Sequence, residues 1–297
     1  MKAFLLTVIL SVTALSFTYA QSSQYLTKEG DPHLLGAFDR AQLEQEPYNE
    51  WYQLVYDRYE PDDELIAKLN DYYDAGVSVK VYMGTWCGDS KREVSRFLKL
   101  VDHSDLSMEQ IELIGLDGRP DKIKQGPNGE EKGLSIHRVP TFLFYKDGEE
   151  IGRIVESPVG NLELDIAQIY AGLAPRPNYR LANYLLDQFA TKPLNTIDSE
   201  VAQNAPYLKS HSKNEGELNT LGYVLMAAGK YDQAVIAFRL NTLLYPESGN
   251  TFDSLGEAYL KAGNKEQAIA NYLKSLQLDA TNENAVNILQ EMLASES

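Results

Sequence analysis

The chain of 297 residues contains one cysteine, Cys87, in a setting where a thiol can do chemistry. Cys87 opens the tetrapeptide Cys-Gly-Asp-Ser at 87–90 and follows Trp86. Alternating apolar and polar residues predict a strand over 77–83, and apolar residues at helical spacing predict an amphipathic helix over 91–101. We therefore expect Cys87 at a helix N-terminus, where free N–H groups and the helix dipole stabilise a thiolate.

Four polar residues are expected to tune this thiol. Ser90, three residues after Cys87, is predicted to donate a hydrogen bond to the sulfur. Arg138 and Lys91 would add positive charge, whereas Asp89 would oppose it. Cys87 and Ser90 are therefore the candidate catalytic residues. Two alternatives stay open: Cys87 is a small, semi-buried side chain without reactivity, or it has an unrelated use such as metal binding.

A second motif, Val-Pro-Thr at 139–141, precedes an apolar strand predicted over 142–145. Together the two motifs resemble the active-site region of thioredoxins, and the resemblance covers about 60–170. It implies a thioredoxin-like α/β fold, with Pro140 in the cis form beside Cys87 and shaping a groove for a peptide. The implied substrate-binding residues are Trp86, Gly88, Asp89, Val139, Pro140 and Thr141.

The chain departs from the thioredoxin pattern at two positions. Ser90 stands where the second cysteine would be, so a mixed disulfide at Cys87 must be resolved by an external thiol. Val81, six residues before Cys87, stands where thioredoxins carry a buried acid. Dithiol activity is therefore not expected. Two hypotheses remain: a monothiol enzyme acting on protein or small thiols and disulfides, or a non-catalytic protein-binding scaffold.

The order of the predicted elements is typical of the thioredoxin fold. We assign 47–174 to the α/β domain and 21–46 to an N-terminal lead-in, of which 21–35 is polar. An Asp-Gly pair at 147–148 predicts a hairpin turn, and 118–135 is rich in glycine, proline and charge, which predicts a loop. The other predicted elements are helices over 47–59, 61–75 and 162–170, and strands over 111–116 and 150–156.

The C-terminal part of the chain repeats itself with a period of 34 residues. The matching positions are Leu221-Gly222 with Leu255-Gly256, Ala234 with Ala268, and Phe238 with Tyr272. This pattern resembles the tetratricopeptide repeat (TPR) and predicts an all-α repeat domain. The copies are placed at 215–248 and 249–282, after a linker and helical region at 175–214 and before a capping helix at 283–297. Such a domain offers a concave surface to a protein partner, or packs only against the α/β domain.

Other candidate residues carry weaker signals. The four histidines, His33, His103, His137 and His211, lack the pair spacing of zinc sites, and no Gly-rich phosphate loop is present. We therefore expect neither a metal nor a cofactor. His137 is predicted to lie near Cys87 as a surface side chain, and Asp117 to form a turn after a strand.

Composition bounds the partners and the location. The formal net charge of −16 argues against nucleic acid and anionic membrane surfaces as partners. Residues 1–20 are predicted to be a secretory signal, with Lys2 before an apolar stretch and cleavage after Ala20. No membrane span is expected, because no later apolar run reaches about 18 residues. We expect an exported protein, periplasmic or extracellular, of a Gram-negative bacterium.

Overall fold

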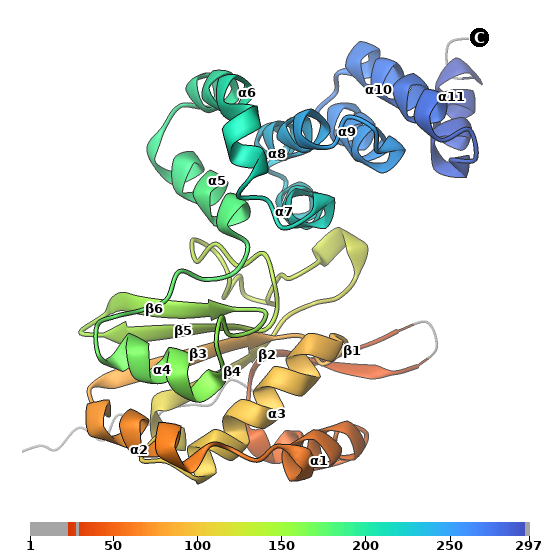
Figure 1. Cartoon of the computed structure of the whole chain (residues 1–297). Coiled ribbons are helices and arrows are strands. Elements are labelled where there is room, and N and C mark those ends of the chain that lie inside the picture. Colours follow the sequence, from red (N-terminus) through yellow and green to blue (C-terminus); the bar gives the residue numbers. More distant parts are fainter. Residues whose placement is uncertain (1–22, 28–29, 295–297) are drawn as a thin grey trace, which may run out of the picture.

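The computed structural model describes residues 23–27 and 30–294, in an α/β domain and a helical domain that lie against each other (Figure 1). The predicted signal segment at 1–20 lies outside the described residues. Among the described helices, none combines the length and apolar character needed to cross a bilayer.

One mixed sheet of six strands forms the centre of the α/β domain. Its order is β1-β2-β4-β3-β5-β6, with β3 parallel to β4 and every other neighbouring pair antiparallel. The strands are β1 (Ser23–Leu26), β2 (Pro32–Phe38), β3 (Val77–Met83), β4 (Ile111–Gly115), β5 (Thr141–Lys146) and β6 (Glu149–Val155).

The first two strands correct the expectation of an N-terminal lead-in at 21–46. β2 pairs with β4 through Gly36, Ala37 and Phe38, so this segment is part of the sheet. The strand was not predicted because Gly36, with a φ of 72°, interrupts the alternation of apolar and polar side chains along β2. Leu34 and Leu35, which are adjacent in the chain, are both buried, so the strand does not show the alternation of a half-exposed one.

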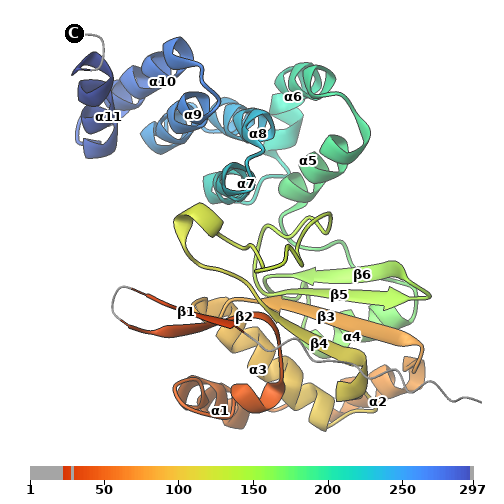
Figure 2. The ribbon, with the colours of Figure 1, turned by 180° about the vertical axis from the view of Figure 1, so that it is seen from behind.

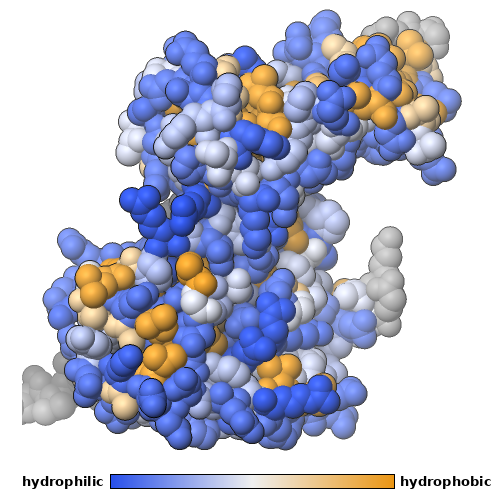
Figure 3. Space-filling view, viewed as in Figure 1, coloured by the Kyte–Doolittle hydropathy of each residue, from blue (hydrophilic) through white to orange (hydrophobic). Residues whose placement is uncertain are grey.

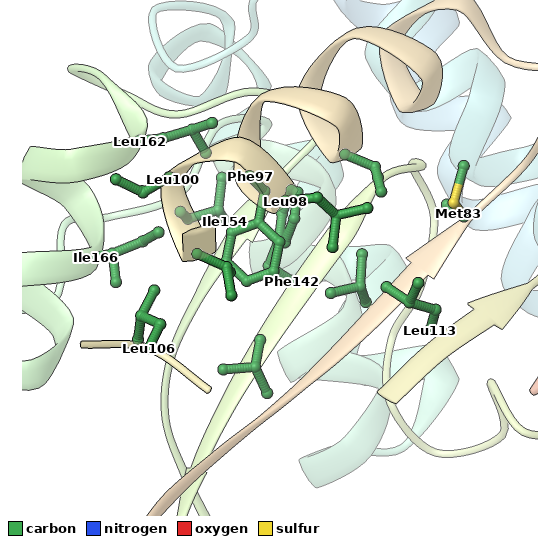
Figure 4. Packing of buried hydrophobic residues seen from close by; sticks show 14 of the residues in the cluster. Met83, Phe97, Leu98, Leu100, Leu106, Leu113, Phe142, Ile154, Leu162 and Ile166 are labelled. Carbon is green, nitrogen blue, oxygen red and sulfur yellow. The ribbon is translucent and has the colours of Figure 1, made fainter. Parts of the chain in front are cut away.

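Four helices accompany the sheet: α1 (Asn49–Arg58), α2 (Asp63–Tyr72), α3 (Gly88–Asp102) and α4 (Leu162–Tyr170). In Figures 1 and 2 they lie on the side of the sheet away from the helical domain. Phe97 of α3 packs on Phe142 of β5, with ring centroids 5.1 Å apart, in the main core (Figure 4). A second, smaller apolar cluster contains Val139 and Leu143, and Cys87 packs against it.

The hairpin and the long loop form as predicted. β5 and β6 are joined by Asp147 and Gly148, whose φ angles of 53° and 83° fit the tight turn that Asp-Gly favours. The segment 118–135 contains no α-helix and only a short helical turn at Pro120–Lys122. It folds back toward the thiol site, as described below.

The helical domain contains seven helices within residues 180–294. They are α5 (Arg180–Thr191), α6 (Leu194–Lys209), α7 (Glu215–Ala227), α8 (Tyr231–Leu244), α9 (Gly249–Lys261), α10 (Lys265–Leu278) and α11 (Glu283–Ala294). α7 pairs with α8 and α9 with α10, as the repeats predict. The preceding helices extend this stack, because α5 packs against α7 and α6 against α8. Glu217 of α7 is fully buried and accepts hydrogen bonds from the N–H groups of Leu181 and Ala182 at the start of α5.

The repeated glycines allow the paired helices to approach closely. A Cβ placed on Gly222 would lie 2.3 Å from the ring of Phe238. At the equivalent position of the next repeat, a Cβ on Gly256 would lie 3.1 Å from the ring of Tyr272. The glycine and the aromatic residue in each repeat are therefore two sides of one contact.

This contact predicts the effect of two alanine substitutions in α7. Gly222→Ala should lower the free energy of unfolding by about 1–3 kcal/mol, because the added methyl overpacks a buried ring. Gly216→Ala is the matched control in the same helix. Its Cβ would meet only the side-chain oxygen of Asn214, at 3.0 Å, so better helix propensity should leave stability equal or up to about 1 kcal/mol higher. Urea unfolding measures both, and equal effects would contradict the close-packing argument.

Candidate thiol site at the domain interface

Cys87 lies at the N-terminus of a helix, as predicted. It is the N-cap residue of α3, with φ −94° and ψ 125°, and its carbonyl accepts the N–H of Lys91 at 3.0 Å. Its side chain is partly buried against the smaller apolar cluster. The thiol is therefore placed where the first free N–H groups of α3 and the positive end of its dipole favour negative charge.

The structure brings the two sequence motifs together. The Val139–Pro140 peptide bond is cis, as the resemblance implied. The Sγ of Cys87 lies 3.4 Å from the carbonyl oxygen of Val139, across 52 positions of sequence. Thr141 closes this turn, since its Oγ1 donates to the carbonyl oxygen of Arg138 at 2.7 Å. Cys87, Val139, Pro140 and Thr141 thus form one local site.

Ser90 makes its hydrogen bond to the backbone rather than to the sulfur of Cys87. Its Oγ accepts the N–H of Gly84 at 3.1 Å, and the residue is fully buried. α3 begins at Gly88 rather than at 91, so Ser90 lies in its first turn, next to the end of β3. The predicted hydrogen bond from Ser90 to the sulfur is wrong in this structure, where Ser90 fixes the turn that carries Cys87.

The remaining predicted binding residues surround the thiol in different ways. Trp86 donates from Nε1 to the carbonyl oxygen of Leu116 at 2.9 Å. Asp89 pairs with Arg92 at 2.7 Å. Gly88 is open, because a Cβ built there would meet no atom within 4 Å. The space beside Gly88 is therefore open, while the Trp86 ring is held by its hydrogen bond.

Lys124 belongs to this site, although the sequence did not point to it. Its residue surface is only 7% exposed, and its Nζ lies 5.6 Å from the centroid of the Trp86 ring. The pKa of Lys124 is lowered to about 8: burial and the cation of Arg138 lower it, and the charges of Cys87 and Glu156 raise it. A lysine in a charged loop is usually solvated, so no local pattern marks a buried one.

His137 is buried, which corrects the expectation of a surface side chain. Its Nδ1 donates to the carbonyl oxygen of Ser135 at 3.3 Å, and its ring meets Tyr179 edge-on at 6.0 Å. Tyr179 leads into α5, so the helical domain covers the histidine. Burial lowers the pKa of His137 to about 3, and the imidazole is neutral at pH 7.

Asp117 forms a turn after β4, as predicted. Its carboxylate accepts the backbone N–H of Arg119 at 2.8 Å and pairs with the Arg119 side chain. Within residues 23–27 and 30–294, no three His, Cys, Asp or Glu side chains gather in an arrangement that would hold a metal ion.

Two hydrogen bonds attach the site loops to the helical domain. Arg138 pairs with Glu156 at 3.2 Å and donates to the carbonyl oxygen of Gly216 in α7 at 2.8 Å. Gln125, next to Lys124, donates from Nε2 to the carbonyl oxygen of Ala227 at 2.7 Å. Both loops that approach Cys87 are therefore held by the ends of α7.

Comparison with known proteins identifies one repeat. Residues 251–282 match the tetratricopeptide repeat family model, which coincides with the second predicted copy. A curated relative is Superkiller protein 3 of Schizosaccharomyces pombe, 24% identical over 139 residues. The match covers 46% of this chain and 10% of the relative, so the chain spans a small part of that protein's length. The molecule thus joins a mixed α/β domain to a helical domain with a TPR-type repeat.

The buried histidine predicts a pH-dependent loss of stability. The pKa of His137 is lowered on folding, from 6.5 to about 3, so the unfolded state binds the proton first. Its contribution is present above pH 6.5 and is lost as pH falls toward 3, by about 2 kcal/mol between pH 7 and pH 5. His137→Gln, which keeps a donor for Ser135, should unfold with a smaller loss over this range.

The control is His103→Gln at an exposed histidine of the same domain, which keeps His137 and should therefore retain most of the wild-type loss. Urea unfolding at pH 7, 6 and 5 supplies the free energies. Equal losses for the wild type and His137→Gln would show that His137 takes up its proton without unfolding.

Proposed function

We propose that the α/β domain is a thioredoxin-like domain that uses Cys87 for monothiol exchange with protein or small-molecule disulfides. The observation that supports this proposal most directly is the contact of Cys87 Sγ with the carbonyl oxygen of Val139, beside cis Pro140. A thiol at the start of α3 and an adjoining turn with an open side at Gly88 suit an extended peptide carrying a disulfide.

The chemistry follows from one thiol. The Cys87 thiolate attacks one sulfur of a client disulfide, the client S–S bond breaks, and the released thiolate takes a proton from water. The resulting mixed disulfide joins Cys87 to the client. Ser90 supplies no second sulfur, so a small thiol or a protein thiol must attack the mixed disulfide and restore Cys87. That attack falls on the client sulfur and leaves the client joined to the external thiol; a second external thiol then attacks the first, releases the client as a thiol and forms a disulfide with the first.

The helical domain is suited to binding a protein partner. TPR-type repeats stack helix pairs into surfaces that bind proteins. Apolar residues remain exposed on this domain, among them Leu243, Leu273 and Leu293, and Figure 3 shows apolar side chains at the end that carries α10 and α11. We propose that this surface binds a protein partner, and that the chain acts after export, in a periplasm or outside the cell.

A second candidate function is a binding scaffold without thiol chemistry. It is favoured by the same exposed apolar residues and by the match of residues 251–282 to a protein-binding repeat. Under this hypothesis Cys87 is only a partly buried packing residue. The two functions differ in what the folded state does to the thiol.

Thiol reactivity separates the two functions. We expect folded wild type at pH 6 to form a mixed disulfide with oxidised glutathione about tenfold faster than the same chain unfolded in urea, because the start of α3 stabilises the thiolate. Mass spectrometry of the full chain gives both rates, and Cys87→Ser serves as the blank. A folded-state rate equal to or below the unfolded rate would favour the scaffold.

A further inference from the structure

We propose that Lys124 is a positioning residue for the thiol: its ammonium group is the cation that keeps Cys87 in the thiolate form. This inference deepens the function proposed for Cys87 and rests on it. No feature of the sequence motifs around Cys87 includes Lys124, which lies 37 residues further along the chain.

The backbone of the long loop carries Lys124 into the site. Its N–H donates to the carbonyl oxygen of Asp117 at 2.8 Å, and the N–H of Asp117 donates to the carbonyl oxygen of Gln125 at 3.0 Å. This reciprocal pair folds the loop back onto the end of β4, and Lys124 adopts a φ of 59° to make it. The side chain then runs over Trp86, the residue before Cys87.

The buried ammonium needs a negative partner. A charge with 7% of its residue surface exposed is costly unless it is compensated. Within the described part of the chain, no carboxylate lies in ion-pair range of Lys124. The Trp86 ring offers a cation–π contact at 5.6 Å, which is weaker than an ion pair.

The other charged groups around Lys124 are paired with one another. Arg138 and Glu156 form an ion pair at 3.2 Å, and Asp117 is paired with Arg119. Arg138 lowers the pKa of Lys124, whereas Cys87 and Glu156 raise it. Because Glu156 is already engaged by Arg138, the thiolate of Cys87 is the negative charge left to balance Lys124.

Lys124 would supply a charged group near the thiol in a chain that lacks the buried acid of thioredoxins at Val81. The resemblance to thioredoxins places a buried acid at Val81, where the structure has a fully buried apolar side chain. Lys124 instead comes from the loop after β4, and its ammonium group lies over Trp86, the residue before the thiol. A positive charge in a site of low dielectric constant favours the thiolate directly. With a pKa of about 8, Lys124 is mostly protonated below pH 8 and loses its charge above it.

The test compares Lys124→Met with Lys124→Arg in the full chain. Met keeps the length and apolar stem without the charge, and Arg keeps a permanent charge. Iodoacetamide, which is uncharged, alkylates Cys87 at pH 5 to 9, and mass spectrometry gives the rates. At pH 6 we expect about a tenfold lower rate for Lys124→Met, and a rate within about twofold of wild type for Lys124→Arg.

The outcomes separate this inference from the function on which it rests. If wild-type Cys87 reacts no faster folded than unfolded, the thiol function itself fails. If wild type is reactive and Lys124→Met reacts equally fast, only the part given to Lys124 is overturned. An alkylation rate that falls as far in Lys124→Arg as in Lys124→Met would also overturn it. The fall would then come from the changed shape of the side chain and not from the lost charge. Thermal unfolding should show both variants folded, since Met removes a buried charge.

Discussion

The contacts of the partly buried guanidinium of Arg138 are the interactions on which the arrangement of this molecule depends. It pairs with Glu156 at the end of β6, donates to the carbonyl oxygen of Gly216 in α7, and lies 4.4 Å from the centroid of the Tyr179 ring. A buried charge must keep its partners, because their loss leaves a desolvated ion. Arg138 also directly precedes the Val139–Pro140 turn, so the same contacts fix the surface beside Cys87.

Local patterns in the sequence were sufficient for the framework of the site. The strand, the cysteine and the helix at 77–101 are contiguous, and each is set by spacing over a few residues. The Asp-Gly hairpin turn is a local signal of the same kind. The 34-residue repeat was found by matching positions along the sequence, and cis Pro140 was implied by the resemblance of the two motifs to thioredoxins.

The missed features depend on contacts between distant segments. β2 is held by pairing with β4, and Gly36 disguises its alternation. His137 is buried because Tyr179, 42 residues later, packs on it. Lys124 enters the site only when its loop pairs with Asp117. No pattern within a single segment contains this information, since burial and pairing are properties of the assembled chain.

The order in which the chain is made bears on the two hydrogen bonds that attach the site loops to α7. Arg138 precedes Gly216 by 78 residues, and Gln125 precedes Ala227 by 102. At synthesis rates of about 5–20 residues per second, the partner of Gln125 follows it by about 5–20 s. The α/β domain is therefore synthesised before the helix that holds its site loops. A newly made chain passes through a stage in which the thiol site has its strands and helices but lacks both hydrogen bonds to α7.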